Sequence, residues 1–361
     1  MLFAILFGCR VCADTIFGAI YVRKNNFDIL RLALALTVMF FHIGGLTGNE
    51  FLKLAPGDLA VKCFFVISGY LISKSYLKNN NLYDYSKSRF LRIYPLYFVC
   101  VTSCFFIGMF LYSDGLVAYL QDGAAKYIVA NLAFLNFIQP DLPGLFVDNL
   151  KNSAVNGSLW TIKIEVMFYI SVPIIYGVIA KIFGKKITVA VIALLSLMSA
   201  IAIEIIVDKY GLSESLKNQL PSLMIFFMAG AALNFFTPSF LNVKYLPLLL
   251  VALYFCDSHI LGKIIYPFVA AAFVYIIAFK TKPISIHDRI GDLSYGVYIF
   301  HYPVIQFMYH FGMYKNFYIG FVSTIVTVLV LAYASWHLME KRLTSHNKKE
   351  KTIPNSVSDA V

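Results

Sequence analysis

Arg31 and His42 stand in an almost entirely apolar stretch near the start of the chain. Arg31 lies close to the beginning of the stretch "FDILRLALALTVMFFHIGG", and His42 lies eleven positions further on. On a helix that rises about 1.5 Å per residue, the two would stand roughly 16 Å apart. Ionisable groups are costly in hydrocarbon, so a functional role is the default hypothesis. Snorkelling of Arg31 to the headgroups and an interhelical hydrogen bond of His42 are the structural alternatives.

A second stretch, "NGSLWTIKIEVMFY", carries the carboxylate of Glu165 among apolar residues. If its helix enters the membrane from outside near Ser158, Glu165 lies about 10 Å below the outer boundary. His42 reaches nearly the same depth on a helix that starts inside. A carboxylate and an imidazole at matched depth can pair, which fixes the imidazole tautomer and raises its basicity. Pairing of Glu165 with Lys163 or with a packing partner is the alternative.

The composition indicates the environment in which these helices stand. The 361 residues are 60% apolar and 14% charged, and their mean hydropathy is +0.74. Soluble domains carry about 25% charged residues, and one of this size could not hide so much apolar surface. The net charge of +11 is spread in short clusters between apolar runs, which is typical of membrane topology signals and argues against nucleic-acid binding. The sequence therefore predicts an all-α fold, a polytopic integral membrane helix bundle.

About ten apolar stretches are candidates for membrane-spanning helices, because a span needs about 20 mostly apolar residues. Lys and Arg gather in alternate loops, which predicts that both termini lie in the cytoplasm. The long loop 114–157 carries few of them and is expected to face out. The candidate spans are residues 27–47, 58–77, 94–113, 158–180, 187–207, 219–236, 243–256, 262–280, 291–311 and 317–339.

The transmembrane domain is predicted to cover residues 23–342. Residues 1–22 form an N-terminal extension to which no role is assigned, and residues 343–361 are expected to be a disordered basic cytoplasmic tail. Cys9 and Cys12 stand in a C-x-x-C arrangement, for which a redox or metal pair is the alternative to free thiols. The other four cysteines lie in or beside apolar runs and are expected to be free. No metal site is predicted.

Six motifs follow one another from residue 27 to about residue 342. They are "FDILRLALALTVMFFH", "FFVISGYLI", "RFLRIYP", "NGSLWTIKIEVMFY", "GDLSYGVYIFHYPV" and "ASWHLMEK". Together they resemble the membrane acyltransferase 3 family, whose members O-acylate bacterial surface glycans. The first motif contains the Arg-x10-His signature of that family at Arg31 and His42. In the last motif, Glu340 precedes Lys341 where the family usually continues into a proline.

The resemblance implies that His42 and Glu165 are the catalytic residues. His42 would act as the general base that takes the proton of the acceptor hydroxyl, or as a transient acyl carrier. Glu165 would orient and polarise the imidazole, as a carboxylate does in hydrolase triads. Ser158 and Trp160, with the backbone around Gly157, would stabilise the developing oxyanion.

The same resemblance implies a binding site for acetyl-CoA, a substrate rather than a permanently bound cofactor. Arg89 and Arg92 are three positions apart and would share a helical face that can bind phosphate oxygens. They precede Pro95, which is expected to help define the start of the next helix. Arg31 would hold another phosphate or the pantetheine arm. Without the resemblance, Arg89 and Arg92 would be interpreted as ordinary positive-inside charges.

A donor that arrives from inside and a histidine in the outer half require a path through the bundle. Ser68, Tyr298 and His301 lie near mid-membrane and are the candidates to line it, with His301 as the second choice for catalysis. The small Gly69 beside Ser68 would also permit a close approach of two helices, which is the structural alternative for this motif.

These expectations converge on one function. The chain would move an acetyl group from cytoplasmic acetyl-CoA to a hydroxyl of a cell-surface polysaccharide or lipid-linked glycan, of O-antigen, capsule or exopolysaccharide type. It would do so at the bacterial inner membrane, with acetyl-CoA, the glycan and membrane lipids as its partners. A polytopic transporter or flippase for a glycan-related substrate is the alternative, because many spans and buried charges suit it equally well.

Overall fold

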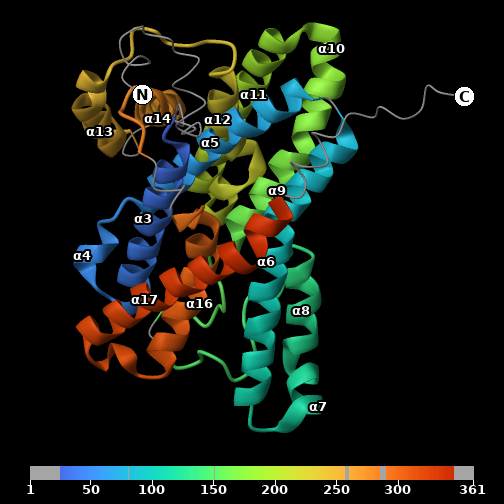
Figure 1. Cartoon of the computed structure of the whole chain (residues 1–361), viewed down its shortest axis with the longest axis vertical. Helices are drawn as coiled ribbons and strands as arrows, with labels where there is room; N and C mark the ends of the chain where they lie inside the picture. The colour runs from blue at the N-terminus through green and yellow to red at the C-terminus, as the bar shows by residue number, and fades with distance from the viewer. Residues whose placement is uncertain (1–24, 80, 150, 257–259, 285–289, 345–361) are drawn as a thin grey trace, which may run out of the picture.

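The computed structural model of the chain describes residues 25–344, apart from positions 80, 150, 257–259 and 285–289. The N-terminal extension, Cys9 and Cys12, and the tail from residue 345 onward lie outside this part. Every regular element in the described residues is helical (Figure 1). The predicted all-α class is therefore confirmed. The four cysteines in the described part are buried, and Cys63, Cys100 and Cys104 are free thiols.

Long helices form the body of the molecule, and short helical pieces join them. The main helices are α3 (Phe27–Thr47), α4 (Glu50–Lys53), α5 (Gly57–Lys78), α6 (Leu82–Leu111), α7 (Gly115–Tyr119), α8 (Ala125–Leu132), α9 (Leu159–Ile174), α10 (Ala180–Phe183), α11 (Lys185–Tyr210), α12 (Leu220–Ala232), α13 (Leu246–Phe255), α14 (Ile260–Phe279), α16 (Ser294–His310) and α17 (Phe317–Ser335).

Seven helical stretches in the described part are long and apolar enough to cross a membrane, so the expected count of about ten is a little high. The three remaining predicted spans fall on α12, α13 and α16, which are 13, 10 and 17 residues long. Most side chains of α12 and α16 are buried against other helices. Hydropathy marks a segment as shielded from water, and it does not distinguish shielding by lipid from shielding by protein.

Two glycines bring α5 and α12 into backbone contact. A Cβ added to Gly69 would lie 1.9 Å from the carbonyl oxygen of Phe227, and one added to Gly230 would lie 1.9 Å from that of Val66. Small residues at such positions let two helices approach more closely than any side chain allows. The close approach expected as the alternative at Gly69 is therefore present.

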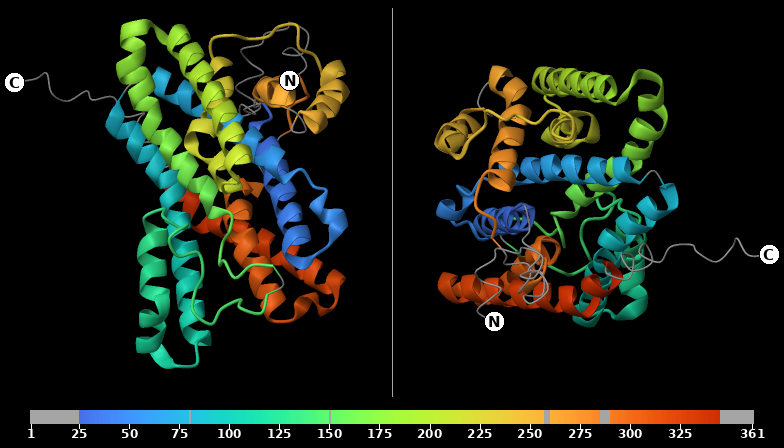
Figure 2. Two further views of the ribbon diagram at one scale, coloured as in Figure 1. Left: turned by 180° about the vertical axis from the view of Figure 1, so that it is seen from behind. Right: turned by 45° about the horizontal axis from the view of Figure 1, so that its top comes forward.

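Pro95 does not start a helix, contrary to expectation. It lies inside α6, a 30-residue helix that begins at Leu82. Asn81 caps that helix with its side-chain oxygen, which accepts a hydrogen bond from the backbone N–H of Asp84. The basic motif before Pro95 therefore lies on the same continuous helix as the span that follows it. The far half of α6 extends beyond the rest of the bundle with α8 beside it (Figures 1 and 2).

The helices that matter for the site pack around α16. This helix contacts α3, α6 and α17, while α9 contacts α5, α6 and α12. Figure 2 shows α17 on one side of the molecule and the α11–α14 group on the other, with α3, α5 and α16 between them. The arrangement brings α3, α5, α6, α9 and α16 around one interior space.

Candidate active site

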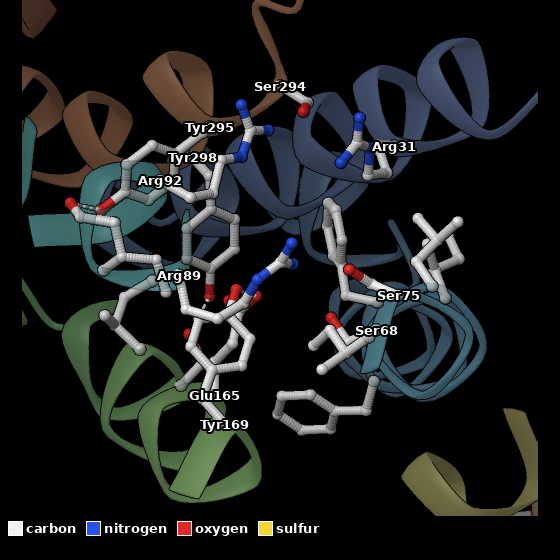
Figure 3. Close-up of a pocket in the computed structure, with 18 of the residues that line it drawn as sticks. Arg31, Ser68, Ser75, Arg89, Arg92, Glu165, Tyr169, Ser294, Tyr295 and Tyr298 are labelled. Carbon is white, nitrogen blue, oxygen red and sulfur yellow. Dashed lines mark hydrogen bonds between the residues drawn. The ribbon is translucent and has the colours of Figure 1, made fainter. Parts of the chain in front are cut away.

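A cavity of about 370 Å³ opens between α3, α5, α6, α9 and α16 (Figure 3). Six of the ten predicted site residues line it, although they come from positions up to 267 apart in the sequence. They are Arg31, Ser68, Arg89, Arg92, Glu165 and Tyr298. The other four, His42, Ser158, Trp160 and His301, lie outside its wall.

Two of the cavity's three arginines share one carboxylate that the sequence interpretation missed. Asp292 Oδ2 is 2.8 Å from an Nη of Arg31 and 2.7 Å from an Nη of Arg92. Its other oxygen accepts a 2.6 Å hydrogen bond from the hydroxyl of Ser294. Arg31 also contacts Asp28 at 2.6 Å. Asp292 is the only acidic residue in the motif "GDLSYGVYIFHYPV", and that was the available signal.

Arg89 differs from the other two arginines. Its guanidinium lies over the rings of Tyr85 and Tyr169, at 5.9 Å and 5.7 Å from their centroids. Its Nε donates a long hydrogen bond to Ser88, and within the described residues it has no carboxylate partner. Figure 3 shows its charged end directed into the cavity. Arg89 is therefore the cation most available to an anionic ligand.

Glu165 lines the same cavity but pairs with neither His42 nor Lys163. Its Oε1 accepts a 2.7 Å hydrogen bond from the hydroxyl of Tyr169, one helical turn away. Lys163 instead donates to Gln219 at 3.2 Å. The predicted contact between Glu165 and His42 is wrong, because α3 packs on α16 and α5 while α9 packs on α5, α6 and α12. Equal depth on two helices does not make the helices neighbours.

His42 pairs with a second imidazole. Its Nδ1 lies 2.8 Å from Nε2 of His301, and the two rings are stacked with centroids 5.0 Å apart. The ring of Tyr302 packs edge-on against His42 at 5.1 Å. His301 is fully buried. His301, the second choice for catalysis, is thus the direct partner of His42, the first choice.

The hydrogen bonds around His301 assign the tautomers of both rings. Nδ1 of His301 lies 3.1 Å from the carbonyl oxygen of Val297, which can only accept, so this nitrogen carries the proton. Nε2 of His301 is then an acceptor, and Nδ1 of His42 donates to it. This assignment leaves Nε2 of neutral His42 with a free lone pair, the state that a base or nucleophile requires.

Tyr298 stands between the cavity and the histidine pair. It lines the cavity, its hydroxyl forms a 2.6 Å hydrogen bond with Thr161, and its ring lies 5.7 Å from that of His301. The ring of Phe64 packs edge-on against it at 5.8 Å. This tyrosine therefore contacts the cavity on one side and His301 on the other.

Ser158 and Trp160 are not part of the cavity wall. The Ser158 hydroxyl donates a 2.6 Å hydrogen bond to Asn156, whose amide in turn donates to the carbonyl of Ile299 on α16. A Cβ at Gly157 would lie 2.7 Å from the ring of Tyr302, the same ring that contacts His42. The segment therefore packs against α16 next to the histidine pair and outside the cavity, and its oxyanion role stays a prediction.

A helical membrane bundle with a cationic cavity and a tautomer-fixed histidine suits a multi-pass membrane transferase, and the family match decides the class. The chain belongs to the acyltransferase 3 family, whose profile, described as an acyltransferase domain, matches residues 24–337. The chain is an acyltransferase, and the membership decides against the transporter alternative.

Relatives of known name match most of the chain. The O-acetyl transferase of Shigella phage Sf6 is 28% identical over 92% of this chain and 99% of its own length. Nodulation protein 10 of Rhizobium leguminosarum bv. viciae is 25% identical over 88% and 93%. O-acetyltransferase OatA of Staphylococcus aureus is 24% identical over 87% of this chain, which spans only 56% of OatA. No solved structure matches.

Proposed function

We propose that the protein is an integral-membrane O-acetyltransferase that moves the acetyl group of acetyl-CoA to a hydroxyl of a cell-surface polysaccharide or lipid-linked glycan. The names of two relatives, O-acetyl transferase and O-acetyltransferase, support the acetyl group and the oxygen acceptor. The observation that carries the proposal is the His42–His301 hydrogen bond, which lies one tyrosine away from a cavity lined by three arginines.

The cavity suits the acyl donor. Arginine guanidinium groups bind phosphate oxygens through charge-assisted hydrogen bonds, and CoA carries several phosphates. Among the described residues, the guanidinium of Arg89 has no carboxylate partner. The Nε–H of Arg31 is buried without a hydrogen-bond partner. These groups would hold the phosphates, while Glu165 would accept hydrogen bonds from the amide groups of the pantetheine arm. The Lys and Arg distribution supports a cytoplasmic opening of this cavity in the inner membrane.

The histidine pair suits the transfer step. As the acceptor oxygen attacks the thioester carbonyl carbon, its proton would pass to Nε2 of His42. The C–S bond then breaks, the imidazolium returns the proton to the departing thiolate, and CoA and the acetyl ester are released. His301 would accept a hydrogen bond from Nδ1–H of His42 throughout and keep the ring in place. A transient acetyl group on the same Nε2 lone pair would use the same geometry.

The test compares envelope glycans from cells with and without the gene by mass spectrometry and NMR. We expect O-acetyl esters that are present only with the gene, and restored by the wild-type protein but not by His42→Ala at equal membrane abundance. An unchanged O-acetyl content in cells with stably inserted His42→Ala would contradict the proposal.

A further inference from the structure

A second cavity, of about 250 Å³, lies beside α5. Its walls come from α5, α11, the 3₁₀ turn η3 (Glu214–Asn218), α12 and α14. The two cavities share α5 as a wall, because Val61 lines the first and Lys62 lines the second. Nothing in the transfer chemistry described above uses the second cavity.

This cavity opens at the end of the bundle at which α3 carries His42. Asp58 and Lys62 stand in the first two turns of α5, and Gly57 before them packs on the ring of Phe41, the neighbour of His42. Two of the acidic side chains that line the cavity are exposed, Asp58 at 52% and Glu214 at 77%. The charge distribution of the loops predicts that this end faces out. A surface glycan would arrive from that side.

The charges that line the second cavity cancel. Glu204 Oε1 lies 3.0 Å from Nζ of Lys217 and 2.6 Å from Nζ of Lys263. Hydrogen bonds from the Lys217 ammonium to Asp208 and Glu214 raise the pKa of Lys217 and keep it charged. The wall thus presents ammonium donors and carboxylate acceptors without an unpaired cation of the kind that an anionic ligand would need. Such a wall suits a ligand with many neutral hydroxyl groups.

The rest of the wall is amphipathic in the way a sugar requires. The ring of Tyr266 packs edge-on against Phe226 at 5.5 Å, with the ammonium of Lys62 4.4 Å from its centroid. Ser222 also lines the cavity, and its buried hydroxyl has no hydrogen-bond partner. Buried polar groups are normally satisfied, so this hydroxyl is suited to a ligand. Aromatic and polar side chains thus line the same cavity, and a pyranose has both apolar C–H surfaces and hydroxyl groups.

We propose that the second cavity binds the saccharide portion of the acceptor. The inference rests on the proposed function and names the place where its acceptor is held: donor and acceptor occupy separate cavities that share α5 as a wall. The cavity is the acceptor's recognition site, and His42 remains the site of chemistry.

The test fills the cavity without removing an ion pair. Ala200 lines it on α11, whereas Met198, two positions earlier, is 59% exposed on the same helix. The full chain is placed in phosphatidylethanolamine–phosphatidylglycerol nanodiscs, and the probe is an oligosaccharide fraction of the surface polysaccharide from cells lacking the gene. We expect Ala200→Phe to weaken oligosaccharide binding and to raise its KM by about tenfold or more, with acetyl-CoA KM and Tm unchanged. Met198→Phe should behave as wild type.

A second variant tests the unpartnered hydroxyl. Ser222→Ala should weaken oligosaccharide binding severalfold without lowering Tm, because the hydroxyl has no protein partner to lose. Unchanged binding in both variants would overturn the acceptor cavity. A second outcome would also overturn it. In this outcome, native mass spectrometry finds a phospholipid that wild type retains and that only Ala200→Phe loses, while oligosaccharide binding is unchanged. Wild-type protein that binds oligosaccharide but transfers no acetyl group would instead contradict the proposed function.

Discussion

At the scale of single residues, the central feature is a chain of two imidazoles that ends on a backbone carbonyl. Val297 fixes the proton on His301, and His301 fixes the proton on His42. In many hydrolases, a carboxylate has this orienting role. A neutral imidazole provides the same acceptor without placing a second charge in a buried site, where an unpaired charge is costly.

His301 is predicted to be a positioning residue. His301→Ala should lower kcat by about 10²-fold or more, as expected for a misoriented general base, with little change in acetyl-CoA KM. His301→Gln keeps an acceptor for Nδ1–H of His42 and should recover part of the rate. Steady-state transfer assays at several pH values measure both. Equal loss in the two variants, with a shifted donor KM, would indicate a merely structural role.

Arg89 is predicted to bind the donor phosphates. Arg89→Gln should raise acetyl-CoA KM by about tenfold or more, because a charge-assisted hydrogen bond is lost, and should leave acceptor KM unchanged. Lys341→Gln removes an exposed charge near the end of the helical stretch Phe317–Thr344 and serves as control. Acetyl-CoA titrations of transfer rate give both constants. The same KM in Arg89→Gln and wild type would show that this guanidinium does not touch the donor.

At the scale of elements, one carboxylate joins three helices. Asp292 precedes α16 and binds Arg31 of α3 and Arg92 of α6. Arg92 also lies 3.9 Å from Glu340, at the end of the π-helical turn η6 (Trp336–Glu340) that follows α17. The arginines are thereby held with their side chains along the cavity wall. Asp292 itself is behind that wall.

Removing that carboxylate is predicted to destabilise the bundle and the donor site together. Asp292→Asn removes the negative charge that balances two largely buried guanidinium groups. Such a change typically costs about 3–5 kcal/mol of folding stability. The Tm in detergent should fall, and acetyl-CoA KM should rise. Glu50→Gln, at a carboxylate that is 80% exposed, is the control and should change neither. A wild-type Tm for Asp292→Asn would refute the bridging role.

The contact between α5 and α12 gives a second prediction for the elements. Gly69→Ala forces a methyl group onto the backbone of Phe227, where no flexible side chain can yield, and should destabilise by about 1–3 kcal/mol or more. Gly45→Ala is the matched control, because nothing lies within 4 Å of its Cβ position. Thermal unfolding of the two purified variants provides the comparison. Indistinguishable Tm values would mean that the helices are less closely packed than described.

At the scale of the whole molecule, the two cavities lie toward opposite ends of α5, and the loop charges predict that these ends face opposite sides of the membrane. A reporter that fluoresces only in the cytoplasm, fused after residue 361, should be active. A phosphatase that is active only outside, inserted in the loop between α8 and α9, should also be active. Fluorescence of the first reporter in the α8–α9 loop, or activity of the phosphatase after residue 361, would reverse the orientation. The proposed entry routes of donor and acceptor would then be reversed as well.

The sequence alone determined the membrane class, the helical fold and the charged residues that line the first cavity. Hydropathy and charge are properties of the chain itself, so the bundle, the positions of His42 and Glu165, and the three arginines could be located without coordinates. The family motifs added the acyltransferase class, and the family match confirms that class.

Only the tertiary structure decided which side chains meet. It paired His42 with His301, gave Arg31 and Arg92 a shared Asp292, and reduced the number of full-length spans. Contacts between helices depend on their rotation, tilt and choice of neighbour, which are set by packing among all of them at once. Hydropathy fixes the depth of a residue in a membrane, but two residues at one depth touch only when their helices are adjacent and face each other.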